Sequence, residues 1–106
     1  MKYRVVLTAR AERDRDTAFD WYAENYSGEF AARWYHALRQ AIRSLRDKPR
    51  RCALAHENDK FSFELREVRF GGRRHKHRIL FTLHEDIVLV LHIRHSARRD
   101  LREEDL

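Results

Sequence analysis

A helical periodicity over residues 30–45 constrains the fold more than any other feature of this sequence. Apolar residues recur there every three or four positions, which is the spacing of one face of an α-helix. They are Ala31, Trp34, Tyr35, Leu38, Ala41, Ile42 and Leu45. Ser27 is a suitable N-cap, and the helix is predicted to end at Lys48, before a proline. Trp34 and Tyr35 lie on the apolar stripe, so we expect them in the core rather than stacked on nucleic-acid bases.

A strand and another helix are predicted ahead of this one. Residues 2–7 form a short β-rich run, and Thr8 is a plausible N-cap for a helix that continues to about Tyr26. The apolar residues of that helix again share one face: Ala11, Ala18, Phe19, Tyr22 and Tyr26. Ser27 and Gly28 interrupt the periodicity, so the two helices should form a hairpin.

Three β-like runs occupy the second half of the chain, over residues 61–70, 73–84 and 87–95. Gly71 and Gly72 tolerate positive φ and indicate a two-residue hairpin turn. The element order is thus β-α-α-β-β-β. We predict an α+β fold in which the N-terminal strand and the helical hairpin pack on an antiparallel sheet, with residues 1–106 as one domain, because this length supports one core.

The register of the last two runs decides which side chains share a face. Ile79, Phe81 and Leu83 alternate in one run, and Ile87, Leu89, Leu91 and Ile93 alternate in the next. A three-residue loop that pairs Leu83 with Ile87 would unite the two sets on one face, so we predict that loop. It would set Arg78 opposite His92 and Lys76 opposite Arg94. A bulge near Glu67 would bring Arg66 alongside Arg78.

Charge and cysteine usage limit the partners and the compartment. The 23 Lys and Arg against 17 Asp and Glu give a net charge of +6, which favours anionic partners. Cys52 is a lone cysteine and cannot form an intramolecular disulfide, and the apolar run at the N-terminus is too short for a signal peptide. No segment reaches the roughly 18 apolar residues of a membrane span. We therefore expect a cytoplasmic protein with no membrane association.

The predicted register places a basic cluster on one face of the sheet. It comprises Arg66, Lys76, Arg78, His92, Arg94, Arg98 and Arg99. Such a cluster could hold phosphates and stabilise charge that develops during RNA cleavage by the 2′-hydroxyl, which needs an acid and a base but no metal. His77, His92 and His95 are candidates for the acid or base. His75 and His77 could chelate a metal, but no cysteine or carboxylate is placed beside them, so we expect neither metal nor cofactor.

Several segments carry a family resemblance. In the first half they are Tyr3-Arg4-Val5-Val6-Leu7-Thr8 with Ala11-Glu12, then Ala32-Arg33-Trp34, Ile42-Arg43-Ser44-Leu45 and Pro49. In the second half they are Glu64-Leu65-Arg66, His77-Arg78-Ile79-Leu80-Phe81 and the stretch from Leu91 to Arg99. Taken in this order, they resemble the RelE/ParE superfamily of toxins from type II toxin–antitoxin systems. The resemblance implies a sheet packed against a helical hairpin and an antitoxin, acidic where it meets the basic cluster, that wraps the toxin as a hetero-oligomer.

The resemblance leaves the molecular target open. RelE-like members cut messenger RNA on the ribosome, whereas ParE-like members inhibit DNA gyrase. For RNA cleavage, Arg78 matches the strand arginine of RelE relatives, and Arg98 or Arg99 matches the arginine after the last strand. We predict Arg78, His92, His95 and Arg98 as catalytic residues and Arg66, Lys76, Arg94 and Arg99 as nucleic-acid-binding residues.

Departures from the RelE pattern leave functions other than RNA cleavage open. Glu64 and Arg66 stand where lysines would be expected, and no tyrosine follows Arg99. Ribosome-dependent endoribonuclease activity is slightly favoured over gyrase inhibition through the long helical hairpin, and a non-toxic module that binds antitoxin and regulates its operon is the third alternative. The acidic finish Glu103-Glu104-Asp105 is predicted to be a frayed tail rather than a cover over the basic face.

Overall fold

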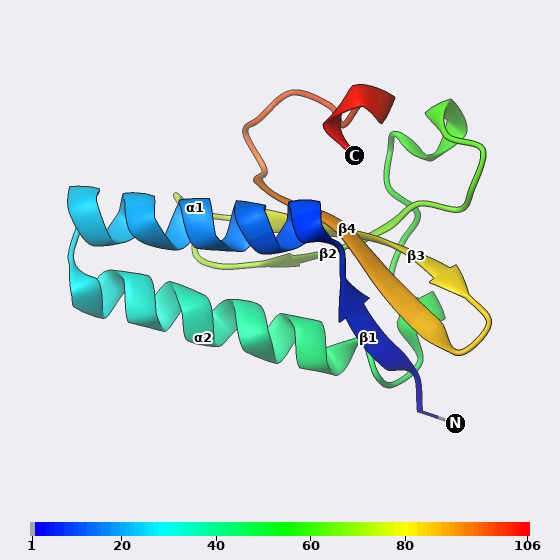
Figure 1. Cartoon of the computed structure of the whole chain (residues 1–106), viewed down its shortest axis with the longest axis horizontal. Helices are drawn as coiled ribbons and strands as arrows, with labels where there is room; N and C mark the ends of the chain where they lie inside the picture. The colour runs from blue at the N-terminus through cyan, green and yellow to red at the C-terminus, as the bar shows by residue number, and fades with distance from the viewer. Residues whose placement is uncertain (1) are drawn as a thin grey trace.

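The computed structural model describes residues 2–106 and confirms the predicted α+β order (Figure 1). Its helices and strands are β1 (Arg4–Leu7), α1 (Ala9–Asn25), α2 (Gly28–Ser44), β2 (Arg66–Phe70), β3 (His77–His84) and β4 (Ile87–His95). Short 3-10 helices cover Pro49–Arg51, Asn58–Lys60 and Glu103–Asp105. In Figure 1, α1 and α2 lie side by side as a hairpin. Neither helix is long and apolar enough to cross a membrane.

Both helices begin at the predicted caps. The Thr8 hydroxyl accepts a hydrogen bond from the Ala11 amide at 3.1 Å, and the Ser27 hydroxyl accepts one from the Phe30 amide at 3.0 Å. Helix α2 ends at Ser44, earlier than the predicted Lys48. The chain must turn there, because Lys48 adopts a left-handed backbone with φ of 46° just before the proline.

The four strands form one sheet in the order β1-β4-β3-β2. Strands β2, β3 and β4 make the expected antiparallel meander, whereas β1 pairs with β4 in parallel. The sheet is therefore mixed rather than antiparallel throughout. Residues 61–65 and 73–76, which the sequence placed in strands, lie outside them.

The predicted register between β3 and β4 is wrong. The turn contains two residues, Glu85 and Asp86, so His84 pairs with Ile87. A bulge then shifts the register, because Phe81 pairs with Val90 while Leu80 pairs with His92. The extra residue in β4 lets Ile79, Phe81, Val88, Val90 and Ile93 all join one core. These side chains of β3 and β4 are thus brought to one face by a bulge within β4 and not by the predicted three-residue loop.

The pairing of β2 also differs from the prediction. Phe70 pairs with His77, so residues 71–76 form the connection, and the two glycines do not make a two-residue turn. The β2 register runs without a break from Arg66, so the bulge near Glu67 is wrong too. Gly71 has φ of +96°, and a Cβ there would lie 2.5 Å from the His75 carbonyl oxygen, so this position requires glycine.

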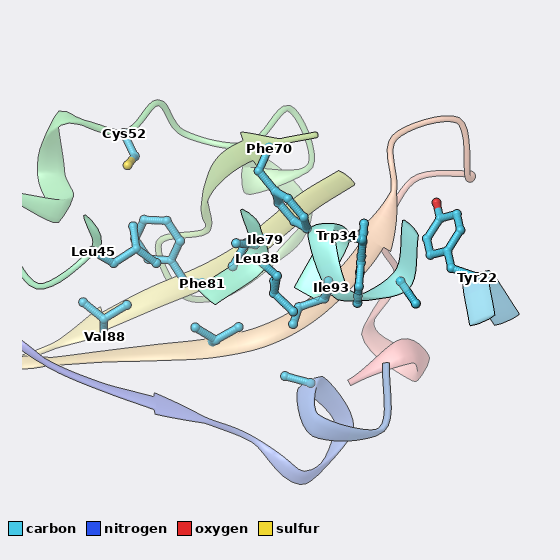
Figure 2. Close-up of a cluster of buried hydrophobic side chains, with 13 residues drawn as sticks. Tyr22, Trp34, Leu38, Leu45, Cys52, Phe70, Ile79, Phe81, Val88 and Ile93 are labelled. Carbon is cyan, nitrogen blue, oxygen red and sulfur yellow. The ribbon is translucent and has the colours of Figure 1, made fainter. Parts of the chain in front are cut away.

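Apolar side chains cover both faces of the sheet. Toward the helices, Trp34 and Leu38 of α2 and Leu45, which follows α2, meet Ile79, Phe81 and Val88 of the sheet (Figure 2). Trp34 is buried and Tyr35 packs against this cluster, as predicted. On the opposite face, a smaller cluster joins the sheet to the segment before β2 and to the C-terminal segment: Ala55, Leu65, Leu80, Leu91 and Leu101.

Candidate functional site

Arg78, the central residue of the predicted site, lies inside a buried ion-pair network. Its guanidinium donates to Glu57 at 2.9 Å through Nη1 and to Glu67 at 2.7 Å through Nη2, and only 2% of the residue is exposed. Burial opposes its charge, but the hydrogen bonds that Arg78 donates to the two carboxylates outweigh burial and raise the pKa of Arg78. Glu57, itself fully buried, also accepts the Leu101 amide at 2.8 Å. Arg78 thus joins β3 to β2 through Glu67 and to the loop before β2 through Glu57.

The neighbours predicted for Arg78 are not beside it in the sheet. The bulge in β4 puts Arg94 opposite Arg78 and Leu80 opposite His92. Arg66 pairs with Phe81, and its guanidinium binds Glu64 and the carbonyls of Arg50 and Cys52. The predicted pairings of Arg78 with His92, of Lys76 with Arg94 and of Arg66 with Arg78 are therefore wrong. The turn after β3 has two residues rather than three, β4 contains a bulge that the prediction lacked, and β2 lacks the bulge that the prediction placed near Glu67.

His92 is fully buried beneath α1. Its Nδ1 lies 3.0 Å from a carboxylate oxygen of Asp14. The same oxygen accepts the Ile93 amide at 3.0 Å, and Arg10 donates to the other oxygen at 3.1 Å. Because β1 pairs with β4 only up to Val90, the Ile93 amide needs this partner from outside the sheet. Asp14 thus holds the bulged part of β4 against α1.

The acidic finish of the chain folds over the basic residues, so the predicted frayed tail is wrong. Asp105 accepts two hydrogen bonds from Arg99 at 2.9 Å and one from Arg94 at 3.4 Å. These arginines, Arg99 first, hold the pKa of the Asp105 carboxyl well below its usual range. Leu101 is fully buried and anchors the same segment against the sheet. A carboxylate of the chain itself therefore occupies part of the predicted nucleic-acid surface.

Arg94 remains incompletely paired. It is 2% exposed, and its Nε and Nη2 atoms have no hydrogen-bond partner among the described residues. Burial and the nearby charge of Arg98 lower the pKa of Arg94 despite its bond to Asp105. The guanidinium of Arg94 is thus a buried cation with unused donors.

The remaining predicted residues lie closer to the surface. Lys76 is exposed in the connection between β2 and β3. His95 and Arg98 line a cavity of about 590 Å³ between α1 and the end of β4, together with Arg10, Arg13 and Trp21. Of the predicted catalytic residues, His95 and Arg98 thus share one cavity, whereas Arg78 does not line it.

One group of potential metal ligands lies near the Arg78 network. His56, Glu57 and Asp100 bring ligand atoms within 4.8 Å of one another, and His56 Nε2 lies 2.6 Å from Asp100. The oxygens of Glu57 are already engaged by Arg78 and Leu101. These residues therefore join the segment before β2 to the C-terminal segment, and the Glu57 oxygens are not free to bind a metal ion.

Sequence reasoning missed the carboxylates that neutralise the basic residues. Glu57 lies in a loop without periodicity, and 21 positions separate it from Arg78, so no spacing rule links them. Asp14 lies on the apolar stripe of α1, three residues after Ala11 and four before Ala18, and its side chain is 10% exposed, so a carboxylate at that position was one available signal. Asp105 belongs to an acidic finish that follows a run of arginines, and this contrast of charge was the other.

Comparison with known proteins agrees with this fold. A model of the ParE toxin of the type II toxin–antitoxin system parDE matches residues 5–100. Among solved structures, the chromosomal ParDE system from P. aeruginosa is similar, with a TM-score of 0.71 and 15% identity over 89% of this chain and 96% of that chain. No curated protein matches the sequence. The match over residues 5–100 covers nearly the whole sequence, and it shows that the chain belongs to the ParE toxin family of type II toxin–antitoxin systems.

Proposed function

We propose that this toxin arrests growth by binding a protein target, DNA gyrase, and not by cleaving messenger RNA. The observation that carries the proposal is the state of Arg78. Its guanidinium is buried and shared between two carboxylates, so it is not presented to a phosphate at the surface. This reverses the slight preference for RNA cleavage that the sequence alone gives.

Metal-independent RNA cleavage makes demands that this surface meets poorly. An acid and a base must reach the 2′-hydroxyl and the leaving oxygen, and a cation must contact the phosphate. His92 is fully buried against Asp14, and Arg94 lies beneath the C-terminal segment. His77 is also buried, and burial lowers the pKa of His77 to about 4, so the ring is neutral near pH 7 and does not supply the imidazolium proton of a general acid.

The helical hairpin offers a better surface for a protein target. Arg39, Arg43 and Arg46 are exposed, and they line a shallow cavity of about 230 Å³ between the helices and β1. The described residues provide no ion pair for these three side chains. We place the contact with an acidic segment of the cognate antitoxin on this same surface, because the basic residues of the sheet already have carboxylates of their own.

Induction of the toxin in bacteria tests the proposal. Incorporation of labelled thymidine and of labelled amino acids is followed separately, and messenger RNA ends are mapped in the same culture. We expect early loss of DNA synthesis, gyrase trapped on DNA and intact messages. Rapid translation arrest with new ribosome-dependent cuts would overturn the proposal, as would the absence of any growth defect.

Two matched double variants locate the surface. Arg39→Gln with Arg43→Gln removes two charges from the hairpin and should reduce both toxicity and gyrase trapping, since interfacial charges steer and hold partners. His95→Gln with Arg98→Gln changes the two predicted catalytic residues that line the other cavity and should leave growth arrest unchanged. The opposite pattern, with toxicity lost in the second variant alone, contradicts the proposal.

A further inference from the structure

The cavity at the end of β4 has the size and walls of a small-molecule site. It measures about 590 Å³, within the range of ligand pockets, which is roughly 300–1,000 Å³. Helix α1 forms one wall through Arg13, Thr17 and Trp21, and the other wall comes from the end of β4 and the residues after it. In Figure 1 this region lies where α1 passes β4 and the C-terminal segment, shown in orange, begins. The hairpin residues that carry the proposed function are not part of it.

Cationic groups outnumber anionic ones in the cavity wall. Its lining residues include four arginines, Arg10, Arg13, Arg94 and Arg98, but one carboxylate, Asp14. Asp14 already pairs with Arg10 at 3.1 Å. Among the described residues, neither Arg13 nor Arg98 forms an ion pair. An anion in the cavity would therefore find charge that no carboxylate of the protein neutralises.

Arg94 is an independent indication that the cavity suits an anion. It is 98% buried, given that 2% is exposed, and two of its three guanidinium nitrogens have no partner among residues 2–106. Buried donors without partners are rare in folded proteins and costly. The positive charge of Arg98 repels the same guanidinium and disfavours its charged form. A dianionic group near Arg98 would relieve this repulsion.

An aromatic surface adjoins the arginines. Trp21 is 52% exposed and lines the cavity, and its ring meets Tyr22 edge-on with centroids 5.3 Å apart. Ala18 and Ile93 add apolar wall, and Thr17 adds a hydroxyl. An exposed indole next to arginines suits a ligand with a flat π-system and a phosphate, because bases stack on aromatic rings while guanidinium groups bind phosphate oxygens.

We propose that this cavity binds a nucleoside 5′-monophosphate, with the base against Trp21 and the phosphate at Arg13 and Arg98. This site is additional to the proposed contact of the helical hairpin with gyrase. Binding there requires neither the arginines of the proposed gyrase contact, Arg39, Arg43 and Arg46, nor any chemical step.

Tryptophan fluorescence of the full chain gives a direct test. The protein has two tryptophans, and Trp34 is buried, so a ligand in the cavity should quench mainly Trp21. Titration with AMP or GMP should give saturable quenching, which weakens as salt is added. Adenosine, ribose 5-phosphate and inorganic phosphate serve as the partial probes, and each should bind at least about tenfold more weakly than AMP, because each lacks the stacking or the charged contacts.

Variants separate this site from general attraction of anions to a basic protein. Arg98→Gln and Arg13→Gln should each weaken AMP binding by about tenfold, which is typical of a lost charged hydrogen bond. Arg39→Gln removes the same charge from the far side of the hairpin and should leave the affinity unchanged. Trp21→Phe removes the reporter, so its affinity is read from the ligand-induced rise in Tm, and it should still bind.

The outcomes are decisive in either direction. Saturable quenching by AMP that Arg98→Gln weakens and Arg39→Gln does not weaken supports the site. Absence of quenching at millimolar AMP overturns it. Equal affinity for inorganic phosphate and AMP overturns the role of Trp21, and equal losses in Arg98→Gln and Arg39→Gln overturn the location.

Discussion

Burial changes what His77 can do. The residue is 4% exposed, and Nδ1 lies 2.9 Å from the His75 carbonyl oxygen, to which it donates. Trp34 and Phe70 surround it with ring centroids 5.3 and 5.5 Å away. Burial is the main reason that the pKa of His77 falls to about 4 from 6.5, and the nearby His95 and His75 add to the decrease. At neutral pH this residue is an uncharged member of the core.

The shift at His77 predicts a loss of stability in mild acid. Because the folded pKa is depressed, the unfolded state binds more protons between pH 6.5 and about 4. The contribution of neutral His77 to the free energy of unfolding is complete above about pH 6.5 and falls as the pH drops toward 4. Between pH 7 and pH 5 the free energy of unfolding should decrease by about 2 kcal/mol. Urea unfolding of the wild type at these two pH values should show the loss, and His77→Phe should reduce it.

His84 provides the control for this measurement. It lies at the end of β3, and its side chain is 79% exposed, so His84→Gln should keep the pH dependence of the wild type. Equal dependence on pH in the wild type and in His77→Phe would show that His77 titrates normally in the folded protein.

At the scale of elements, the loop between α2 and β2 depends on the ion pairs of Arg78. Glu57 of this loop joins β3 through Arg78 and joins the C-terminal segment through the Leu101 amide. Breaking a buried ion pair by removing one charge typically costs about 3 kcal/mol or more, because the other charge stays buried. Glu57→Gln should therefore lower the free energy of unfolding by about 3 kcal/mol, with Glu67 limiting the loss.

Glu64→Gln is the matched control in the same loop. Glu64 is exposed and pairs on the surface with Arg66 and, at 3.5 Å, with Arg50, and surface ion pairs contribute about 1 kcal/mol or less. Urea unfolding at pH 7 compares the two variants. If Glu57→Gln and Glu64→Gln are equally stable, the Arg78 network does not anchor the loop.

Elements were predictable from the sequence wherever local rules applied. Thr8 and Ser27 identified both helix starts, and the apolar stripe identified the buried face of α2. The register failed because alternation within β4 gave no sign of the bulge between Val90 and His92. The prediction also assumed one buried face, whereas Leu65 and Leu91 belong to a second cluster on the opposite face. Strands buried on both faces give an ambiguous pattern.

The sequence predicted which residues belong to the candidate site but not how they are arranged or paired. The sequence identified the arginines and histidines, but the partners of Arg78 and Arg94 come from segments distant in the sequence. Whether an arginine is open or neutralised depends on those contacts. For this reason the predicted arginines have different surroundings: Arg78 lies in a buried ion-pair network, Arg98 lines a cavity, and Arg94 does both.

At the scale of the whole molecule, the C-terminal segment completes the second core. Leu101 is fully buried against Leu65, Leu80 and Leu91, and Asp105 reaches Arg94 and Arg99 nearby. A frayed tail would instead leave the apolar face of the sheet uncovered, which few folded proteins tolerate over a large area. Residues 99–106 thus belong to the folded unit.

Two leucines of this segment test that conclusion. Leu101→Ala should lower the free energy of unfolding by about 3 kcal/mol, because it removes a buried side chain and leaves a cavity. Leu106 is 44% exposed, so Leu106→Ala should change the stability by about 0.5 kcal/mol or less. Urea unfolding measures both variants, and limited digestion with trypsin should cut Leu101→Ala after Arg98 or Arg99 faster than the wild type. Equal stability and equal digestion of the two variants would mean that the segment is frayed in solution, and Arg94 would then be open to anions from outside the chain.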